Sequence, residues 1–137
     1  MSGGTTRPVE RPTLALLRTS RAMSEAVSVV TARFGLTVDQ WLLLELLVDH
    51  RSSGLSMTEL RELTGLTGPT LTRTVDRLIS DALAHREVDA HDRRRVLVHV
   101  STEGRAVHRR SVASVDKLEE EMGYVSEGAA PYVHGNT

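Results

Sequence analysis

Apolar residues recur every three or four positions along most of this chain, a spacing typical of amphipathic helices. The pattern predicts five helices, at residues 13–34, 37–50, 56–63, 67–78 and 101–122. After Ala82 the period changes from 3.6 to 2, which predicts two strands at residues 83–87 and 96–100. The expected fold is therefore mainly α with a small β-hairpin.

The first two predicted helices differ in how apolar residues are distributed around them. The second helix is apolar on nearly all sides over residues 41–48, so we expect it to be central and buried. The first helix instead carries one narrow seam of coiled-coil type. The seam consists of Leu16, Ser20, Met23, Val27, Val30 and Phe34. It could pack against a partner subunit or against the chain's own core, and the pattern favours both equally.

Polar residues at the predicted helix starts support these boundaries. Thr37 and Gln40 have the spacing of a capping box, and Ser56 and Glu59 repeat it. Thr67 is the expected N-cap of the fourth helix, which tolerates a proline in its first turn.

The fourth predicted helix has two different faces. One face is an apolar stripe that includes Leu71, Val75 and Leu78. The other face carries small hydroxyls and two long cations, namely Thr70, Thr72, Arg73, Thr74 and Arg77. Such a surface suits a DNA groove, because arginine can pair bidentately with guanine and hydroxyls can reach several base edges. The helix alone equally allows an ordinary solvated face.

The segments around this helix favour DNA binding. A short helix and a turn of about three residues precede it, which is the helix-turn-helix pattern, and a hairpin follows, which makes a winged helix. The loop of the hairpin contains Arg93, Arg94 and Arg95. A free-standing basic loop suits a narrow minor groove. Asp92 would partly neutralise this cluster, so we expect it to orient an arginine.

Composition sets limits on these hypotheses. A chain of 137 residues with 39% hydrophobic and 26% charged residues is expected to form one globular domain. The net charge of −1 gives no global attraction to nucleic acid, so DNA binding would rest on local charge. The absence of cysteine excludes disulfides and thiolate metal sites. Neither a membrane span nor a signal core is evident, so we expect a cytoplasmic protein with residues 1–12 as a disordered arm and 124–137 as a loose tail.

Other chemistry finds little support. His85, Glu87 and Asp89 would share one face of a strand and could form a weak metal site, but a charged wing beside DNA is the favoured interpretation. No residue set points to catalysis or to a cofactor, so we expect neither an enzyme nor a bound metal.

The segment from residue 68 to residue 105 resembles the recognition helix and wing of the MarR family of bacterial transcription regulators. The most specific part is DRRRVLVHVSTEG at residues 92–104, and LTVDQWLLLELL at residues 36–47 is similar to the family's second helix. The resemblance runs without gaps from about Leu36 to Arg110.

This resemblance implies a homodimeric winged helix-turn-helix protein that reads a pseudo-palindromic double-stranded DNA site. Residues 36–101 would form the DNA-binding lobe, and residues 13–35 and 102–123 would be dimerisation helices, all within a domain at 13–123. The implied recognition contacts are Thr67, Thr70, Thr72, Arg73 and Arg77, and the implied wing contacts are Arg93 and Arg94, with Asp92 holding Arg94. Family members usually continue with a sixth amphipathic helix, which is not evident after residue 123, so we expect a smaller dimer interface.

The leading hypothesis is thus a sequence-specific regulator, acting as a repressor that a small aromatic or lipophilic anion releases from DNA. Arg18, Arg21 and Trp41 are candidate residues for the effector pocket, although each also has a structural explanation. The alternative is a winged-helix adaptor that binds proteins and not DNA. An adaptor would have no need for Arg73, Arg77 and Arg94 together.

Overall fold

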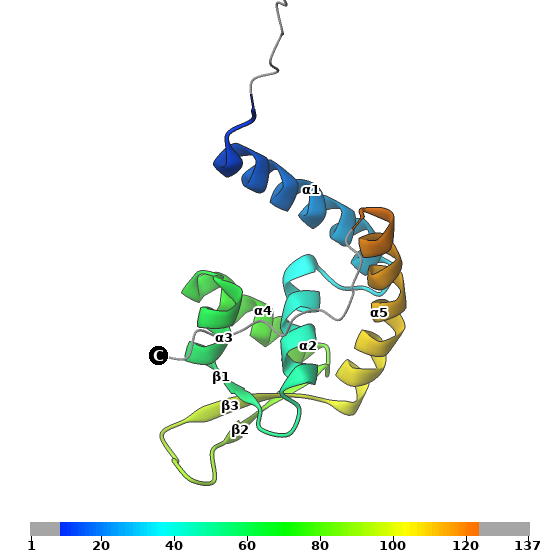
Figure 1. Ribbon diagram of the computed structural model, residues 1–137. Coiled ribbons are helices and arrows are strands. Elements are labelled where there is room, and N and C mark those ends of the chain that lie inside the picture. Colours follow the sequence, from blue (N-terminus) through cyan, green and yellow to red (C-terminus); the bar gives the residue numbers. More distant parts are fainter. Residues whose placement is uncertain (1–8, 124–137) are drawn as a thin grey trace, which may run out of the picture.

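The apolar second helix lies at the centre of the molecule. The computed structural model describes residues 9–123, and there this helix is α2 (Val38–Asp49). Leu43, Leu44 and Leu47 are at most 1% exposed, because α1, α3, α4, α5 and β3 all contact α2. Figure 1 shows α2 between the long helices at one end and the hairpin at the other. The sequence prediction of a central, buried helix is confirmed.

Two short helices follow α2 in the helix-turn-helix arrangement. They are α3 (Met57–Thr64) and α4 (Gly68–Ser80), separated by a turn that begins at Gly65, whose positive φ of 69° suits glycine. Their apolar faces join α2 and the sheet in one core. The fully buried residues from these elements include Leu60, Leu71, Val75, Leu78 and Val98.

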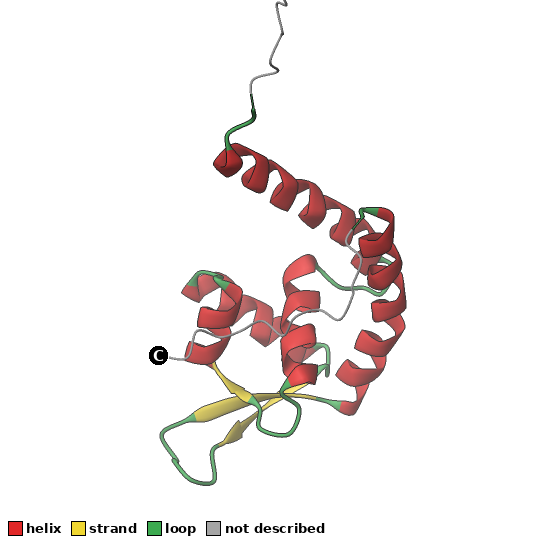
Figure 2. Ribbon diagram, viewed as in Figure 1, coloured by secondary structure: helices red, strands yellow, loops and turns green. Residues whose placement is uncertain are grey.

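The sheet has three antiparallel strands in the order β1-β3-β2. β2 (Ala84–Val88) and β3 (Val96–Val100) pair along their full length, with His85 opposite His99 and Glu87 opposite Leu97. These two strands and their loop form the wing (Figure 2). The sequence prediction missed β1 (Leu55–Ser56), because two residues are too few to show a period of two.

The two long helices α1 (Pro12–Ala32) and α5 (Thr102–Glu121) lie side by side over the second half of α1 (Figure 1). The apolar seam of α1 divides accordingly. Val27 and Val30 are buried, whereas Leu16 is 72% exposed and its neighbours Leu14 and Leu17 are more than half exposed. The seam therefore packs on the chain's own core over one half of the helix and stays uncovered over the other.

The helix starts agree with the predicted caps in part. Thr37 and Gln40 form the complete capping box, with distances of 3.1 and 2.9 Å. At α3, the Ser56 hydroxyl accepts from the Glu59 backbone N–H, but the Glu59 carboxylate accepts from that hydroxyl and not from the backbone. At α4, Thr67 is the N-cap by position, yet its side chain makes no capping bond. The second box is therefore incomplete, and the predicted side-chain cap at Thr67 is wrong.

The remaining boundaries differ from the prediction by one or two residues. Pro12 already belongs to α1, so the expected N-terminal arm is one residue shorter. The expected arm at residues 1–8 and tail at residues 124–137 lie outside the described residues, as does any sixth helix. No helix among residues 9–123 is long and apolar enough to cross a membrane.

Candidate nucleic-acid interface

The polar face of α4 is positioned by the burial of its other face. Leu71, Val75 and Leu78 anchor the helix in the core, which turns Thr72, Arg73 and Arg77 to the outside, where all three are exposed. The Thr67 hydroxyl donates to the Thr70 hydroxyl at 3.0 Å. Arg73 donates to the same Thr70 oxygen at 3.4 Å, so the first turn of α4 forms a small polar network.

Thr74 does not belong to this outward face. It is buried, and its hydroxyl donates to the Thr70 carbonyl at 2.7 Å. Threonine commonly satisfies its hydroxyl in this way within a helix. Its role is therefore internal to α4.

A groove of about 260 Å³ runs between the start of α2 and the arginines of α4. It is lined by Thr37, Asp39, Gln40, Arg73, Thr74 and Arg77. Asp81 orients this region, because its carboxylate lies 3.6 Å from Arg77 Nε and accepts from Gln40 at 3.5 Å. Sequence reasoning used Gln40 only as a capping residue and missed that it joins α2 to α4. A buried polar residue in an otherwise apolar helix was the available signal.

The wing loop is built from aspartate turns and not from glycine. Asp92 Oδ1 accepts from the Arg94 backbone N–H at 3.1 Å, and the Arg95 N–H donates to the Asp92 carbonyl at 2.9 Å. The Asp89 carboxylate accepts from the His91 N–H at 2.9 Å in the same manner. Asp92 was expected to hold the Arg94 guanidinium. It holds the Arg94 backbone instead, and so fixes where that side chain leaves the loop.

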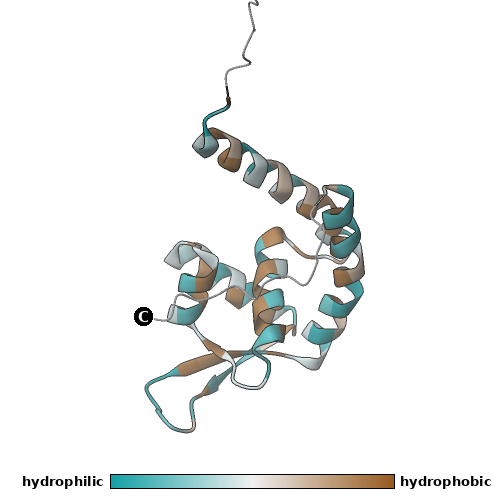
Figure 3. Ribbon diagram, viewed as in Figure 1, coloured by the Kyte–Doolittle hydropathy of each residue, from teal (hydrophilic) through white to brown (hydrophobic). Residues whose placement is uncertain are grey.

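Only two of the three wing arginines are free to act at the tip. Arg95 forms an ion pair with Glu59 of α3, which ties the end of the loop back to the helix-turn-helix. Arg93 and Arg94 are exposed and have no ion-pair partner among residues 9–123. Figure 3 shows the loop between β2 and β3 as strongly hydrophilic. The expected cluster of three free charges is therefore reduced to two.

A second ion pair joins the wing to α4. Arg86 of β2 donates to Asp76 of α4 at 2.6 Å. This pair fixes the angle between the hairpin and the helix, because it spans two elements that also share core contacts. Sequence reasoning missed it, since residues ten positions apart in different elements give no periodic signal.

The suggested metal cluster does not form. His85 lies 3.1 Å from Glu87, but it stacks on His99 with ring centroids 5.4 Å apart and does not converge with it on a common point. The Asp89 carboxylate is used in the loop turn. Within residues 9–123 no three His, Asp or Glu side chains are arranged to hold a metal ion.

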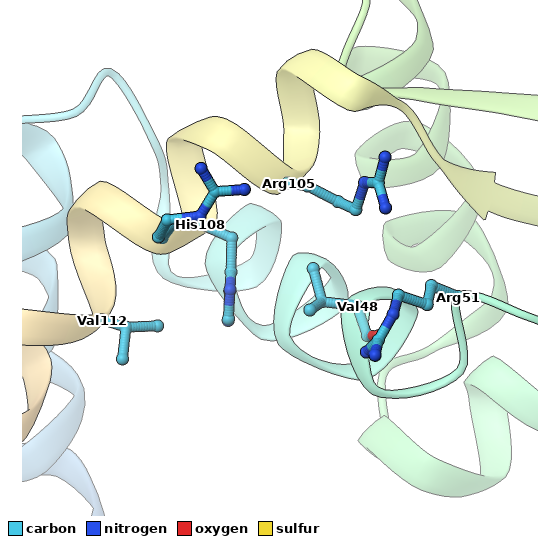
Figure 4. A pocket seen from close by; sticks show the side chains of 6 residues that line it. Val48, Arg51, Arg105, His108 and Val112 are labelled. Carbon is cyan, nitrogen blue, oxygen red and sulfur yellow. The ribbon is translucent and has the colours of Figure 1, made fainter.

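The three candidate effector residues lie apart from the larger groove of the molecule. Arg18 is exposed and pairs with Glu10 at 2.7 Å, Arg21 is exposed, and Trp41 packs against the core. The larger groove, of about 360 Å³, lies between the end of α2 and the start of α5 (Figure 4). Its lining residues are Val48, Arg51, Arg105, His108, Arg109 and Val112, and sequence reasoning singled out none of them.

Comparison with known proteins agrees with this architecture. A sequence model of the MarR family matches residues 34–95, from the end of α1 to the tip of the wing. The HTH-type transcriptional repressor YetL of Bacillus subtilis is 31% identical over 93 residues, which are 68% of this chain. The chain covers 56% of the length of YetL.

Solved structures give the same picture. A mutant of S. aureus MepR, bound to an oligodeoxyribonucleotide, has a TM-score of 0.64 and 26% identity over 86% of this chain and 87% of that one. CouR from Rhodococcus jostii, bound to p-coumaroyl-CoA, has a TM-score of 0.75 and 23% identity over 93% of this chain and 82% of CouR, which shows the shared fold. A family match that spans α2 to the wing tip, on a five-helix winged fold with these neighbours, shows that this chain belongs to the MarR family.

Proposed function

We propose that this chain is a sequence-specific DNA-binding transcription regulator that acts as a repressor. The observation that carries the proposal is the pairing of exposed arginines on α4 with two arginines at the wing tip that have no ion-pair partner among residues 9–123. The names of two relatives support it, since YetL is a transcriptional repressor and the MepR mutant is bound to an oligodeoxyribonucleotide. A role on DNA would place the protein in the cytoplasm.

The outward face of α4 would enter the major groove. Arg73 and Arg77 would contact bases or phosphates, and one arginine–guanine pair gives roughly 1–3 kcal/mol of discrimination. Thr67, Thr70 and Thr72 would contact phosphates or base edges beside them. The groove between α2 and α4 lies against the same arginines, so the N-terminus of α2 would approach the DNA backbone as well.

The wing would contact the minor groove. Arg94 would insert there, with Arg93 beside it on the backbone, because narrow minor grooves carry enhanced negative potential. Asp92 would act indirectly, by fixing the backbone from which Arg94 projects. The two ion pairs at Glu59 and Asp76 would hold the wing at a constant distance from α4.

A homodimer would place two such units on a pseudo-palindrome. We propose residues 36–101 as the DNA-binding lobe and 13–35 with 102–123 as the dimerisation helices. The exposed leucines of α1 support this, because a helix rarely leaves such residues in water without a partner. Half-sites would lie about one helical turn, ~10 bp, apart. An anionic effector would release the DNA only if it binds the DNA-incompetent arrangement more tightly.

The test is a fluorescence-anisotropy titration with the duplex from the chain's own upstream intergenic region, at two salt concentrations, beside a scrambled duplex of equal length. We expect tight binding to the native duplex and weak, more salt-sensitive binding to the scrambled one. Arg73→Ala and Arg94→Ala should each lose affinity for the native duplex, while Arg110→Ala, on the exposed side of α5, should not. Equal, weak binding of both duplexes by the unmodified protein would favour the adaptor function instead.

A further inference from the structure

The groove between α2 and α5 carries an unusual concentration of positive charge. Arg51 follows the end of α2, and Arg105 and Arg109 lie in the first two turns of α5. All three are exposed, and none has an ion-pair partner among the described residues. In Figure 4, Arg105 extends from α5 over the end of α2, where Arg51 lies. We call this groove, with its six lining residues given above, the arginine groove.

This arrangement is electrostatically unfavourable without an anion. Arg105 and Arg109 are four residues apart on one helix, a spacing at which like charges destabilise by roughly 0.2–0.5 kcal/mol. Arg105 also lies near the positive end of the α5 dipole. Arg51 donates to the Val48 carbonyl at 3.3 Å, which orients it but does not neutralise it. An anion bound in the groove would relieve all of these repulsions together.

The other titratable group of the groove is already paired. His108 contacts Glu45 of α2 through Nε2, and its side chain is only 12% exposed. The Glu45 carboxylate is therefore engaged beside the groove, and it does not neutralise the arginines. The net charge presented to a ligand comes from the three guanidinium groups.

The groove also has an apolar part and a defined size. Val48 and Val112 line it from α2 and α5 respectively, and Figure 4 shows Val112 at the end away from Arg51 and Arg105. Its volume of about 360 Å³ is near the lower end of the ~300–1,000 Å³ found for small-molecule sites. It can hold a compact ligand that is charged at one end and apolar at the other.

We propose that the arginine groove binds a small organic phosphate with a short apolar or aromatic group. A phosphate monoester carries close to two negative charges at neutral pH and three acceptor oxygens, which three arginines can share. Guanidinium forks fit phosphate oxygens bidentately, so they favour this group over a carboxylate that brings one charge and two oxygens. The apolar group would lie against the two valines.

The position of the groove suggests what binding does, and this step rests on the proposed function. α2 belongs to the proposed DNA-binding lobe and α5 to the proposed dimerisation helices, so one ligand would contact both. A bound phosphate would draw the start of α5 towards the end of α2 and fix the angle between the lobes. Since the two α4 helices of a dimer must fit successive major grooves, such a change weakens DNA binding.

Calorimetric titration of the full chain tests the binding site without DNA. Phenyl phosphate is the probe, and inorganic phosphate, benzoate and benzyl alcohol each lack one part of it. We expect phenyl phosphate to bind at least tenfold more tightly than the other three. Arg105→Gln combined with Arg109→Gln should weaken it by a further tenfold or more, while Arg110→Gln, one position outside the groove, should leave it unchanged. Equal affinity for benzoate or for inorganic phosphate would overturn the proposed ligand class, as would unchanged affinity in the double variant.

A second measurement separates this site from the proposed function. Phenyl phosphate is titrated into the protein bound to fluorescent operator duplex, and the release of the duplex is followed by anisotropy. Release by the unmodified protein, lost in the Arg105→Gln, Arg109→Gln variant, supports the regulatory role. Calorimetric binding without release would overturn that role and leave the site intact. A protein that binds phenyl phosphate but no DNA would refute the proposed function and not the site.

Discussion

Gly104 lies where the first turn of α5 meets the end of the α4–β2 connection. A Cβ atom at this position would come within 2.1 Å of the Leu83 carbonyl oxygen and 2.8 Å of Val100 Cγ2. The first of these contacts is with backbone, which cannot rotate away. Ser101 reinforces the junction, because its hydroxyl accepts from the Gly104 N–H at 2.9 Å and donates to the Ala82 carbonyl at 2.7 Å. The glycine of the wing motif is therefore required by a close approach.

Replacing Gly104 with alanine should destabilise the protein by about 1–3 kcal/mol, because the added methyl overpacks a junction that has no room for it. Urea unfolding measures the change. Gly68→Ala is the matched control, since its Cβ would meet nothing within 4 Å, and it should be neutral or slightly stabilising. Equal stability of the two variants would show that the junction can relax.

Glu119 on α5 is the residue whose ionisation is most clearly unfavourable. Partial burial, then the nearby charges of Asp116 and Glu45, raise the pKa of its carboxyl above the usual value. The folded protein therefore holds this proton more tightly than the unfolded chain does. Stability falls as the pH rises from about 4.5 through the raised folded pKa, and the full penalty is present at pH 7.

Glu119→Gln should consequently stabilise the protein at pH 7 and have little effect below pH 4. Relief from Asp116 alone, three residues earlier on the same helix, is worth about 0.2–0.5 kcal/mol. Chemical denaturation at the two pH values measures both effects. Glu120→Gln, at the neighbouring position, should show a smaller difference between them. A stabilisation by Glu119→Gln that is the same at both pH values would exclude a charge effect.

At the scale of elements, the wing acts as a braced unit. The Glu59–Arg95 pair ties the loop end to α3, and the Asp76–Arg86 pair ties β2 to α4. The first of these also withholds one positive charge from the tip. The wing is thus restrained in position and limited to two free arginines among the residues that the structure describes.

Glu59→Gln should release Arg95 and add one basic contact to nucleic acid. We expect tighter binding to scrambled duplex, and a plot of log affinity against log salt that is steeper by about one unit. The ratio of specific to non-specific affinity should fall. Glu62→Gln removes the same charge from an exposed position of α3, so it controls for general electrostatics. A salt slope that rises equally in both variants would contradict a specific release of Arg95.

The elements themselves were largely predictable, and their connections were not. The burial of α4 through Leu71, Val75 and Leu78 follows from their spacing, because a helix repeats its faces every 3.6 residues. β1 has no such repeat, and it exists because β3 offers it a free edge. The arginine partners Glu59 and Asp76 lie on other elements, so only the folded geometry reveals which charges are free. The arginine groove escaped for the same reason, since its residues come from positions far apart in the sequence.

At the scale of the whole molecule, the exposed half of α1 is the feature that a single chain leaves unexplained. Leu14, Leu16 and Leu17 are each more than half exposed, on the part of α1 that extends beyond α5. Covering them in a proposed dimer would bury surface worth about 1.5–3 kcal/mol for each leucine. It would also set the distance between the two copies of α4, and therefore the spacing of the DNA half-sites.

The variant with Leu16→Glu and Leu17→Glu should therefore dissociate and lose operator affinity together. Loss of two buried leucines, with two added like charges across a symmetric interface, should weaken the dimer by more than about a hundredfold. Sedimentation over a range of concentrations measures the dimer, and anisotropy compares a full operator with a duplex that carries one half-site. The variant should bind both duplexes with the same low affinity, because each monomer reads one half-site. Ala22→Glu, which places a charge on another side of α1, should leave the dimer and its preference for the full operator intact. A dissociated variant that still prefers the full operator would mean that α4 and the wing alone supply the specificity, and that α1 serves another contact.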